Sequence, residues 1–132
     1  KNLAEQESCV IVGKCADYVL KGRPNVVSIY IEASRAFCVQ RTMDHMGVTE
    51  EVAHATISRT DQYRAQYYQH YTHGNYWTNP VNYDMTLNSE KVGVYNCVKV
   101  IEQYLIIKGF ITPERIKPVM EPKLDEHEED RK

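Results

Sequence analysis

Residues 26–34 have the sequence VVSIYIEAS, and this stretch decides the fold. Its first six residues are β-branched or aromatic apart from one serine, which is the composition of a short buried strand. Ser34, at the end of the stretch, is a residue type that caps helices by accepting a hydrogen bond from a backbone amide. The sequence therefore predicts a strand over 26–31 followed by a helix from Ser34 to about Met46, which Gly47 ends.

The same alternation of strand and helix extends in both directions. Upstream, the continuous apolar run 9–12 stops at Gly13 and predicts a parallel strand that is buried on both faces. Downstream, the pattern predicts a helix from Thr49 to around Tyr68, a loop over 71–80, a strand over 83–87 and a helix over 92–108. Strands separated by helical crossovers indicate an α/β domain with a parallel sheet.

The apolar spacing also predicts which side of each helix faces inward. The predicted inward residues are Ala36, Val39, Met43 and Met46 in the first helix; Ala53 and Ile57 in the second; and Val94, Cys97, Val98, Ile101, Tyr104 and Leu105 in the third.

Composition narrows the class of protein. The chain has 132 residues, 42% of them apolar, with a formal net charge of -2, and these values favour one globular domain that binds neither nucleic acid nor a membrane. Four cysteines without a CxxC pair predict reduced, mostly buried thiols and a cytoplasmic location. Because the proline-containing segment after Gly109 leads into an acidic tail, we expect residues 110–132 to be disordered.

Residues 58–64, Ser-Arg-Thr-Asp-Gln-Tyr-Arg, are the first candidate for chemistry. Asp61 and Arg64 are three residues apart, so they are neighbours on a helix and the carboxylate can orient the guanidinium. With Arg59, two arginines at a junction between helix and loop suit a phosphate group, because each guanidinium donates paired hydrogen bonds. On spacing alone, a solvated helix face with an ion pair is the better explanation.

Three longer motifs favour the phosphate-binding interpretation of these arginines. They are Gly13-Lys14-Cys15-Ala16-Asp17; Thr60-Asp61 followed by Arg64-Ala65 and Tyr67-Tyr68; and Trp77-Thr78-Asn79-Pro80-Val81-Asn82-Tyr83-Asp84. In this order, they resemble the bacterial cytidylate-kinase-like family of P-loop nucleoside monophosphate kinases, from about residue 3 to residue 107. We therefore expect a domain over 1–109 that is part of a three-layer α/β/α P-loop kinase fold, with a parallel sheet and a helical lid at about 58–80.

The resemblance also implies an activity: ATP-dependent phosphoryl transfer, with Mg2+, to a nucleoside monophosphate such as CMP or dCMP. Arg59 and Arg64 match the lid arginines that neutralise the phosphoryl group in flight, and Asp61 would hold Arg64 in place. The resemblance places Lys14 and Asp17 at the acceptor site and Arg41 near ATP. For Lys14 and Arg41 an exposed surface position is an equal alternative, and for Asp17 a local cap or pair is the preferred one.

The chain departs from the family in three places. Lys14 and Cys38 stand where the family has arginines, and no Gly-x-x-x-x-Gly-Lys-[Ser/Thr] phosphate loop occurs in the sequence. We expect an upstream segment to carry that loop and the chain alone to be inactive. The alternative function is a non-catalytic relative that binds nucleotides or proteins.

Two further patterns stay open at this stage. His70 and His73 have a spacing found in metal sites, but no further ligand follows in a recognisable pattern, so we predict no metal site in the chain. Six aromatic residues suit either stacking on a base or, preferably, packing of the lid against its own loop: Tyr63, Tyr67, Tyr68, Tyr71, Tyr76 and Trp77.

Overall fold

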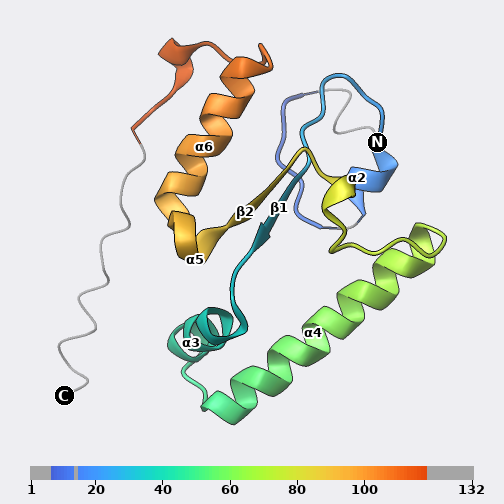
Figure 1. Ribbon diagram of the computed structural model, residues 1–132, viewed down its shortest axis with the longest axis vertical. Coiled ribbons are helices and arrows are strands. Elements are labelled where there is room, and N and C mark those ends of the chain that lie inside the picture. Colours follow the sequence, from blue (N-terminus) through green and yellow to red (C-terminus); the bar gives the residue numbers. More distant parts are fainter. Residues whose placement is uncertain (1–6, 14, 119–132) are drawn as a thin grey trace. The chain divides into compact units, whose positions relative to one another are not determined.

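The computed structural model describes residues 7–13 and 15–118, in two units that meet between Lys91 and Val92. Figure 1 shows the order of the elements along the chain. The first unit contains α2 (Ala16–Val19), β1 (Ile29–Glu32), α3 (Arg35–Met46), α4 (Glu50–Tyr71), η1 (Pro80–Asn82) and β2 (Met85–Asn88). The short helix α5 (Ser89–Val92) reaches the boundary, and the second unit contains α6 (Val94–Ile107) and η2 (Pro113–Arg115).

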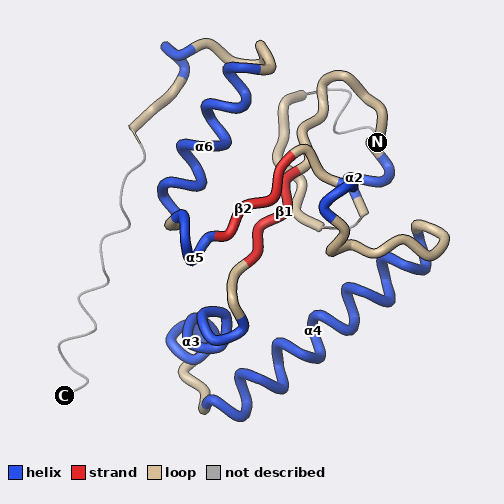
Figure 2. The backbone as a smooth tube through the Cα atoms, in the orientation of Figure 1, coloured by secondary structure: helices blue, strands red, loops and turns tan. Residues whose placement is uncertain are grey.

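The two strands β1 and β2 form a parallel pair, as predicted (Figure 2). Ile29 lies opposite Met85 and Glu32 opposite Asn88. Because parallel neighbours need a long crossover, the whole of α3 and α4 lies in the connection between them. The chain is thus an α/β protein with mixed helices and a small parallel sheet.

The prediction of a strand over Cys9–Val12 is wrong. These residues adopt no strand conformation, and the side chains of Val10 and Val12 are 93% and 88% exposed. An apolar run becomes a strand only when a neighbouring strand accepts its backbone hydrogen bonds. In the described part of the chain, the sheet consists of β1 and β2 alone, and neither pairs with this run.

The caps of α3 and α4 are confirmed. The Ser34 hydroxyl accepts a hydrogen bond from the Phe37 amide at 3.2 Å, and the Thr49 hydroxyl accepts one from the Val52 amide at 3.3 Å. Gly47 ends α3 with a φ of 65°, a left-handed conformation that glycine adopts without a steric penalty. Helix α4 runs three residues beyond the predicted end, to Tyr71.

The buried side of the two helices is narrower than the apolar spacing predicts. Val39 is buried and Ala53 has no exposed surface, whereas Ala36 and Met46 are exposed, so the prediction was wrong for these two. Within this unit α3 packs against α4, and one neighbouring helix covers only a strip of a predicted inward face.

The second unit is organised around α6, close to the predicted bounds. Cys97 is buried, but Val94 and Val98 are 48% and 37% exposed, so the inward prediction is wrong for these two valines. Gly109 follows the helix with a φ of 77°, and the Phe110 amide donates back to the Leu105 carbonyl at 2.9 Å, which closes the helix end. Of the tail predicted to be disordered, residues 119–132 lie outside the described residues, and 110–118 include η2.

The predictions made from the cysteines and from hydropathy can be compared with the same residues. All four cysteines are free; Cys15 and Cys97 are buried, Cys38 is partly buried and Cys9 is exposed. Among the helices that the structure describes, none is both long and apolar enough to cross a bilayer.

Enlarging Ala53 tests the packing of the crossover helices. Because Ala53 has no exposed surface, we expect Ala53→Leu to force its neighbours apart and lower the free energy of unfolding by about 1–3 kcal/mol. The matched control is Ala55→Leu, an exposed alanine on the same helix, with an expected change within about 0.5 kcal/mol. Urea unfolding measures both, and equal effects would contradict the packing described.

Candidate functional site

The predicted lid arginines Arg59 and Arg64 lie within α4, twelve and seven residues before its end, and not at a junction with a loop. Arg59 and Arg64 are both exposed. Five residues at 3.6 per turn turn the helix by about 140° beyond one full revolution, so the two arginines project from different sides of α4. The structure therefore does not bring them together as one clamp, and each has its own surroundings.

Arg64 lies with Asp61 and Tyr30. Its guanidinium is 3.6 Å from the Asp61 carboxylate, in a pair whose side chains are 60% and 46% exposed. Burial raises the pKa of the Tyr30 phenol, the Glu32 and Asp61 charges raise it further, and Arg64 opposes them. These effects place Arg64 and Asp61 close to a strand of the sheet. The pairing of Asp61 with Arg64 is as predicted, and so exposed a pair contributes little to stability but does orient the guanidinium.

Asp17 lies in a different cluster. Its carboxylate accepts a hydrogen bond of 2.6 Å from the hydroxyl of Tyr68, which is buried near the end of α4. Burial and this bond raise the pKa of Tyr68 well above its ordinary value. Because Tyr83 comes just before β2 and feels the Asp17 charge, the cluster lies at the end of the sheet where β2 begins.

Three aromatic rings complete this region. Tyr30 stacks on Tyr83 with ring centroids 5.3 Å apart and meets Trp77 edge-on at 5.4 Å. The Tyr83 hydroxyl donates to the Trp77 carbonyl, so the loop before β2 is fastened to itself and to β1. Of the six aromatic residues with two predicted roles, Trp77 and Tyr68 pack inside the unit, whereas Tyr63, Tyr71 and Tyr76 are largely exposed.

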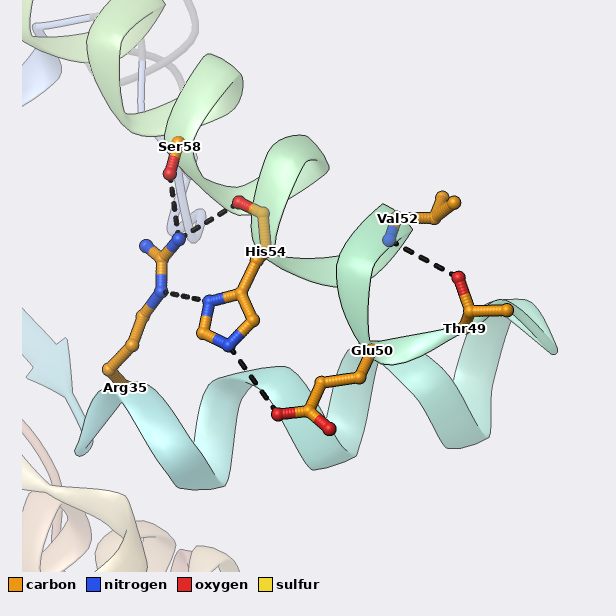
Figure 3. Close-up of polar contacts among 6 residues, drawn as sticks. All are labelled: Arg35, Thr49, Glu50, Val52, His54 and Ser58. Carbon is orange, nitrogen blue, oxygen red and sulfur yellow. Dashed lines mark hydrogen bonds and ion pairs between the residues drawn. The ribbon is translucent and has the colours of Figure 1, made fainter.

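A polar cluster between α3 and α4 was not predicted from the sequence (Figure 3). Arg35 donates from Nε to His54 Nδ1 at 3.2 Å, and from one terminal nitrogen to the His54 carbonyl at 2.9 Å and the Ser58 hydroxyl at 2.7 Å. Glu50 lies 3.8 Å from His54 Nε2. The i,i+4 spacing of Glu50 and His54 can be seen in the sequence, but the contact of Arg35, on α3, with His54 and Ser58, on α4, depends on the tertiary fold.

The remaining predicted residues lie apart from these clusters. Arg41 is exposed on α3, and its guanidinium lies 5.9 Å from the ring centre of Phe37 on the same helix. Cys38 is partly buried, with its sulfur 3.9 Å from the Ala33 carbonyl. Lys14 lies outside the described residues.

Anion binding needs unpaired cationic side chains, whereas metal binding needs a group of ligand side chains close together. Within the described residues, neither Arg59 nor Arg41 forms an ion pair, so both guanidinium groups are available to an anion. The same residues contain no group of three or more His, Cys, Asp or Glu side chains placed to hold a metal.

Fold and charge define an α/β protein with exposed arginines on its crossover helices. The model of the cytidylate kinase-like family matches residues 1–91, and the chain belongs to this family. The crystal structure of an uncharacterized protein from Eubacterium ventriosum is similar, with a TM-score of 0.74 and 31% identity. The similarity covers 79% of this chain and 57% of that one, so this chain corresponds to little more than half of the relative's length. No curated protein matches the chain.

Replacing Arg35 tests the polar cluster. In Arg35→Lys the charge remains, but one ammonium group cannot reproduce the three hydrogen bonds of the guanidinium. We expect the free energy of unfolding to fall by about 1 kcal/mol. The control is Arg41→Lys, because the Arg41 guanidinium lies against Phe37 of its own helix. For this variant we expect less than half of the loss in the free energy of unfolding. Equal losses would show that the cluster does not join the helices.

The raised pKa of the Tyr83 phenol predicts that stability falls at alkaline pH. Burial, and then the Asp17 charge, raise its pKa from 10 to about 12. The folded state therefore favours the neutral phenol: this contribution is complete below pH 10 and is lost as pH rises towards 12. We expect the unfolding free energy to decline over this window and Tyr83→Phe to make the decline less steep. The control is Tyr63→Phe, which removes the hydroxyl of an exposed tyrosine and should leave the slope of unfolding free energy against pH as in wild type. An unchanged slope in Tyr83→Phe would show that Tyr83 does not cause the decline.

Proposed function

We propose that the intact protein transfers a phosphoryl group from ATP to a nucleoside monophosphate, CMP or dCMP in the first instance. The observation that carries the proposal is the Asp61–Arg64 pair, an oriented guanidinium close to the sheet, within the region that matches the family. Phosphoryl transfer needs positioned positive charge more than a covalent partner, because negative charge spreads over the phosphoryl oxygens in the transition state. An oriented arginine supplies that charge.

In this proposal the arginines divide the work. Arg64 meets the phosphoryl group in flight, and Asp61 is its positioning residue. Arg59, on another side of α4, meets a phosphate that does not react, and Arg41 on α3 is available to ATP in the same way. Asp17 and Lys14 contribute to the acceptor site. Mg2+ would bridge the phosphates.

The proposal includes the larger fold and the place of this chain within it. We infer that β1 and β2 belong to a longer parallel sheet in a three-layer α/β/α kinase domain, whose phosphate loop comes from a part of the intact protein other than this chain. Two observations support this inference: the family match, and the relative that is longer than this chain. On its own the chain should be inactive.

Two observations favour the alternative, a non-catalytic relative that binds nucleotides or proteins. Cys38 and Lys14 stand where the family has arginines, and the Asp17 carboxylate is already bonded to Tyr68. A protein with these changes retains exposed arginines for binding, but it has no cation at Cys38, and the Lys14 ammonium cannot make the paired hydrogen bonds of a guanidinium. Nucleotide binding by the intact protein without turnover would support this alternative.

Kinetics of the intact protein test the proposed division. We expect Arg64→Ala to lower kcat for phosphoryl transfer to CMP by about 10²–10³-fold, because its charge acts in the transition state. Arg59→Ala should mainly raise KM, since it contacts a phosphate equally in ground and transition states. The control is Arg115→Ala, an exposed arginine outside the family match, with unchanged kinetics. Unchanged kcat in Arg64→Ala would contradict the proposal.

A further inference from the structure

An aromatic stripe runs along α4 from Arg59. Tyr63, Tyr67 and Tyr71 follow Arg59 at intervals of four residues, so each lies next to the previous one on the helix surface. The ring centroids of Tyr63 and Tyr67 are 6.1 Å apart, and those of Tyr67 and Tyr71 are 4.6 Å apart. The rings therefore form a continuous ladder, here called the aromatic stripe, with a cation at its amino-terminal end.

The outer rings of the aromatic stripe are open to solvent. Tyr63 is 63% and Tyr71 is 55% exposed, although a tyrosine ring gains free energy when it is covered. The centroid of the neighbouring Tyr67 ring lies 6.1 Å from that of Tyr63, so the Tyr67 ring excludes some of the positions that the Tyr63 side chain could otherwise occupy. A restrained aromatic surface loses less conformational entropy on binding than a freely rotating side chain.

At the amino-terminal end of the aromatic stripe lie a positively charged side chain and a residue with a small side chain. Within the described residues Arg59 forms no ion pair, and one turn before it stands Ala55, an exposed residue with a small side chain. Arg59 and Tyr63 are about one helical turn apart, so their Cβ atoms are separated by roughly 5–6 Å. A ligand that fits this surface would have a flat group to cover the Tyr63 ring and an anionic group to meet the Arg59 guanidinium.

We propose that the Arg59–Tyr63 end of the aromatic stripe binds a nucleotide, with the base stacked on the Tyr63 ring and a phosphate on the Arg59 guanidinium. Stacking on an aromatic side chain accepts every base, because each has a π-face. Arg59 contributes the electrostatic part and Tyr63 the part that distinguishes a nucleotide from a bare phosphate chain. The inference rests on the proposed function, since it assigns the base-binding surface for the nucleotide whose phosphate meets Arg59.

Binding measurements on the full chain test this surface without requiring turnover. The probes are ATP and inorganic tripolyphosphate, titrated by calorimetry into wild type and variants. We expect ATP to bind more tightly than tripolyphosphate. Tyr63→Leu should lower the affinity for ATP by about 5- to 150-fold and leave the affinity for tripolyphosphate unchanged. Tyr63→Trp keeps the stacking surface and should restore ATP binding. Arg59→Ala should weaken both probes.

The control is Tyr76→Leu, which removes a tyrosine that is 64% exposed but lies outside the aromatic stripe. It should leave both affinities as in wild type, and circular dichroism should show the same helix content for every variant. Equal ATP affinity in Tyr63→Leu and wild type overturns the inference, as does ATP binding no tighter than tripolyphosphate, or no binding of either probe.

The outcome separates this inference from the proposed function. If the intact protein transfers phosphate and Tyr63→Leu has no effect on ATP binding, the stacking surface is wrong and the kinase proposal stands. If ATP binding depends on Tyr63 and the intact protein shows no turnover, the stacking surface stands and the chain belongs to a nucleotide-binding protein without kinase activity.

Discussion

The hydrogen bond from Tyr68 to Asp17 is the constraint on which the candidate site depends. Helix α4 has 22 residues and is therefore about 33 Å long, yet only Ala53 and Tyr68 on it are buried. A long helix with so little buried surface keeps its place through a few specific contacts. At one end the Arg35 guanidinium binds His54 and Ser58, and at the other Tyr68 binds Asp17. The position of Arg64, between these two points, follows from both.

Helical geometry then assigns different chemistry to two arginines that look alike in the sequence. Arg64 and Asp61 lie on the side of α4 from which their charges reach Tyr30 in the sheet. Arg59 lies on the side that carries the Tyr63 ring, and in the described residues it forms no ion pair. In the proposed function, one helix would therefore supply a cation to the reacting phosphoryl group and a separate surface to the rest of the nucleotide. Its two sides do not depend on each other for their contacts.

Much of the local structure could be predicted because short-range rules decide it. Ser34 and Thr49 cap their helices, and Gly47 ends one, because a hydroxyl near a free amide and a residue without a Cβ act over a few positions only. The pairing of Asp61 with Arg64 follows in the same way from helical spacing. These features need no knowledge of the rest of the fold.

The failures all involve partners that are distant in the sequence. The run Cys9–Val12 has the composition of a strand, but a strand needs a neighbour, and the described residues supply none to it. Met46 has the right spacing to face inward, but the packing of α3 against α4 does not cover it. The three hydrogen bonds of Arg35 and the bond between Asp17 and Tyr68 join residues 19 to 51 positions apart. No local sequence pattern predicts contacts between residues so far apart in the chain.

A double-mutant cycle of Tyr68→Phe and Asp17→Ala tests the central claim most directly, with the free energy of unfolding measured for the wild type, both single variants and the double variant. If the hydroxyl and the carboxylate hold α4 together with α2, the two losses overlap, and the coupling energy is about 1–3 kcal/mol. Losses that add within about 0.5 kcal/mol would show that the two residues act independently and that α4 is positioned by other contacts.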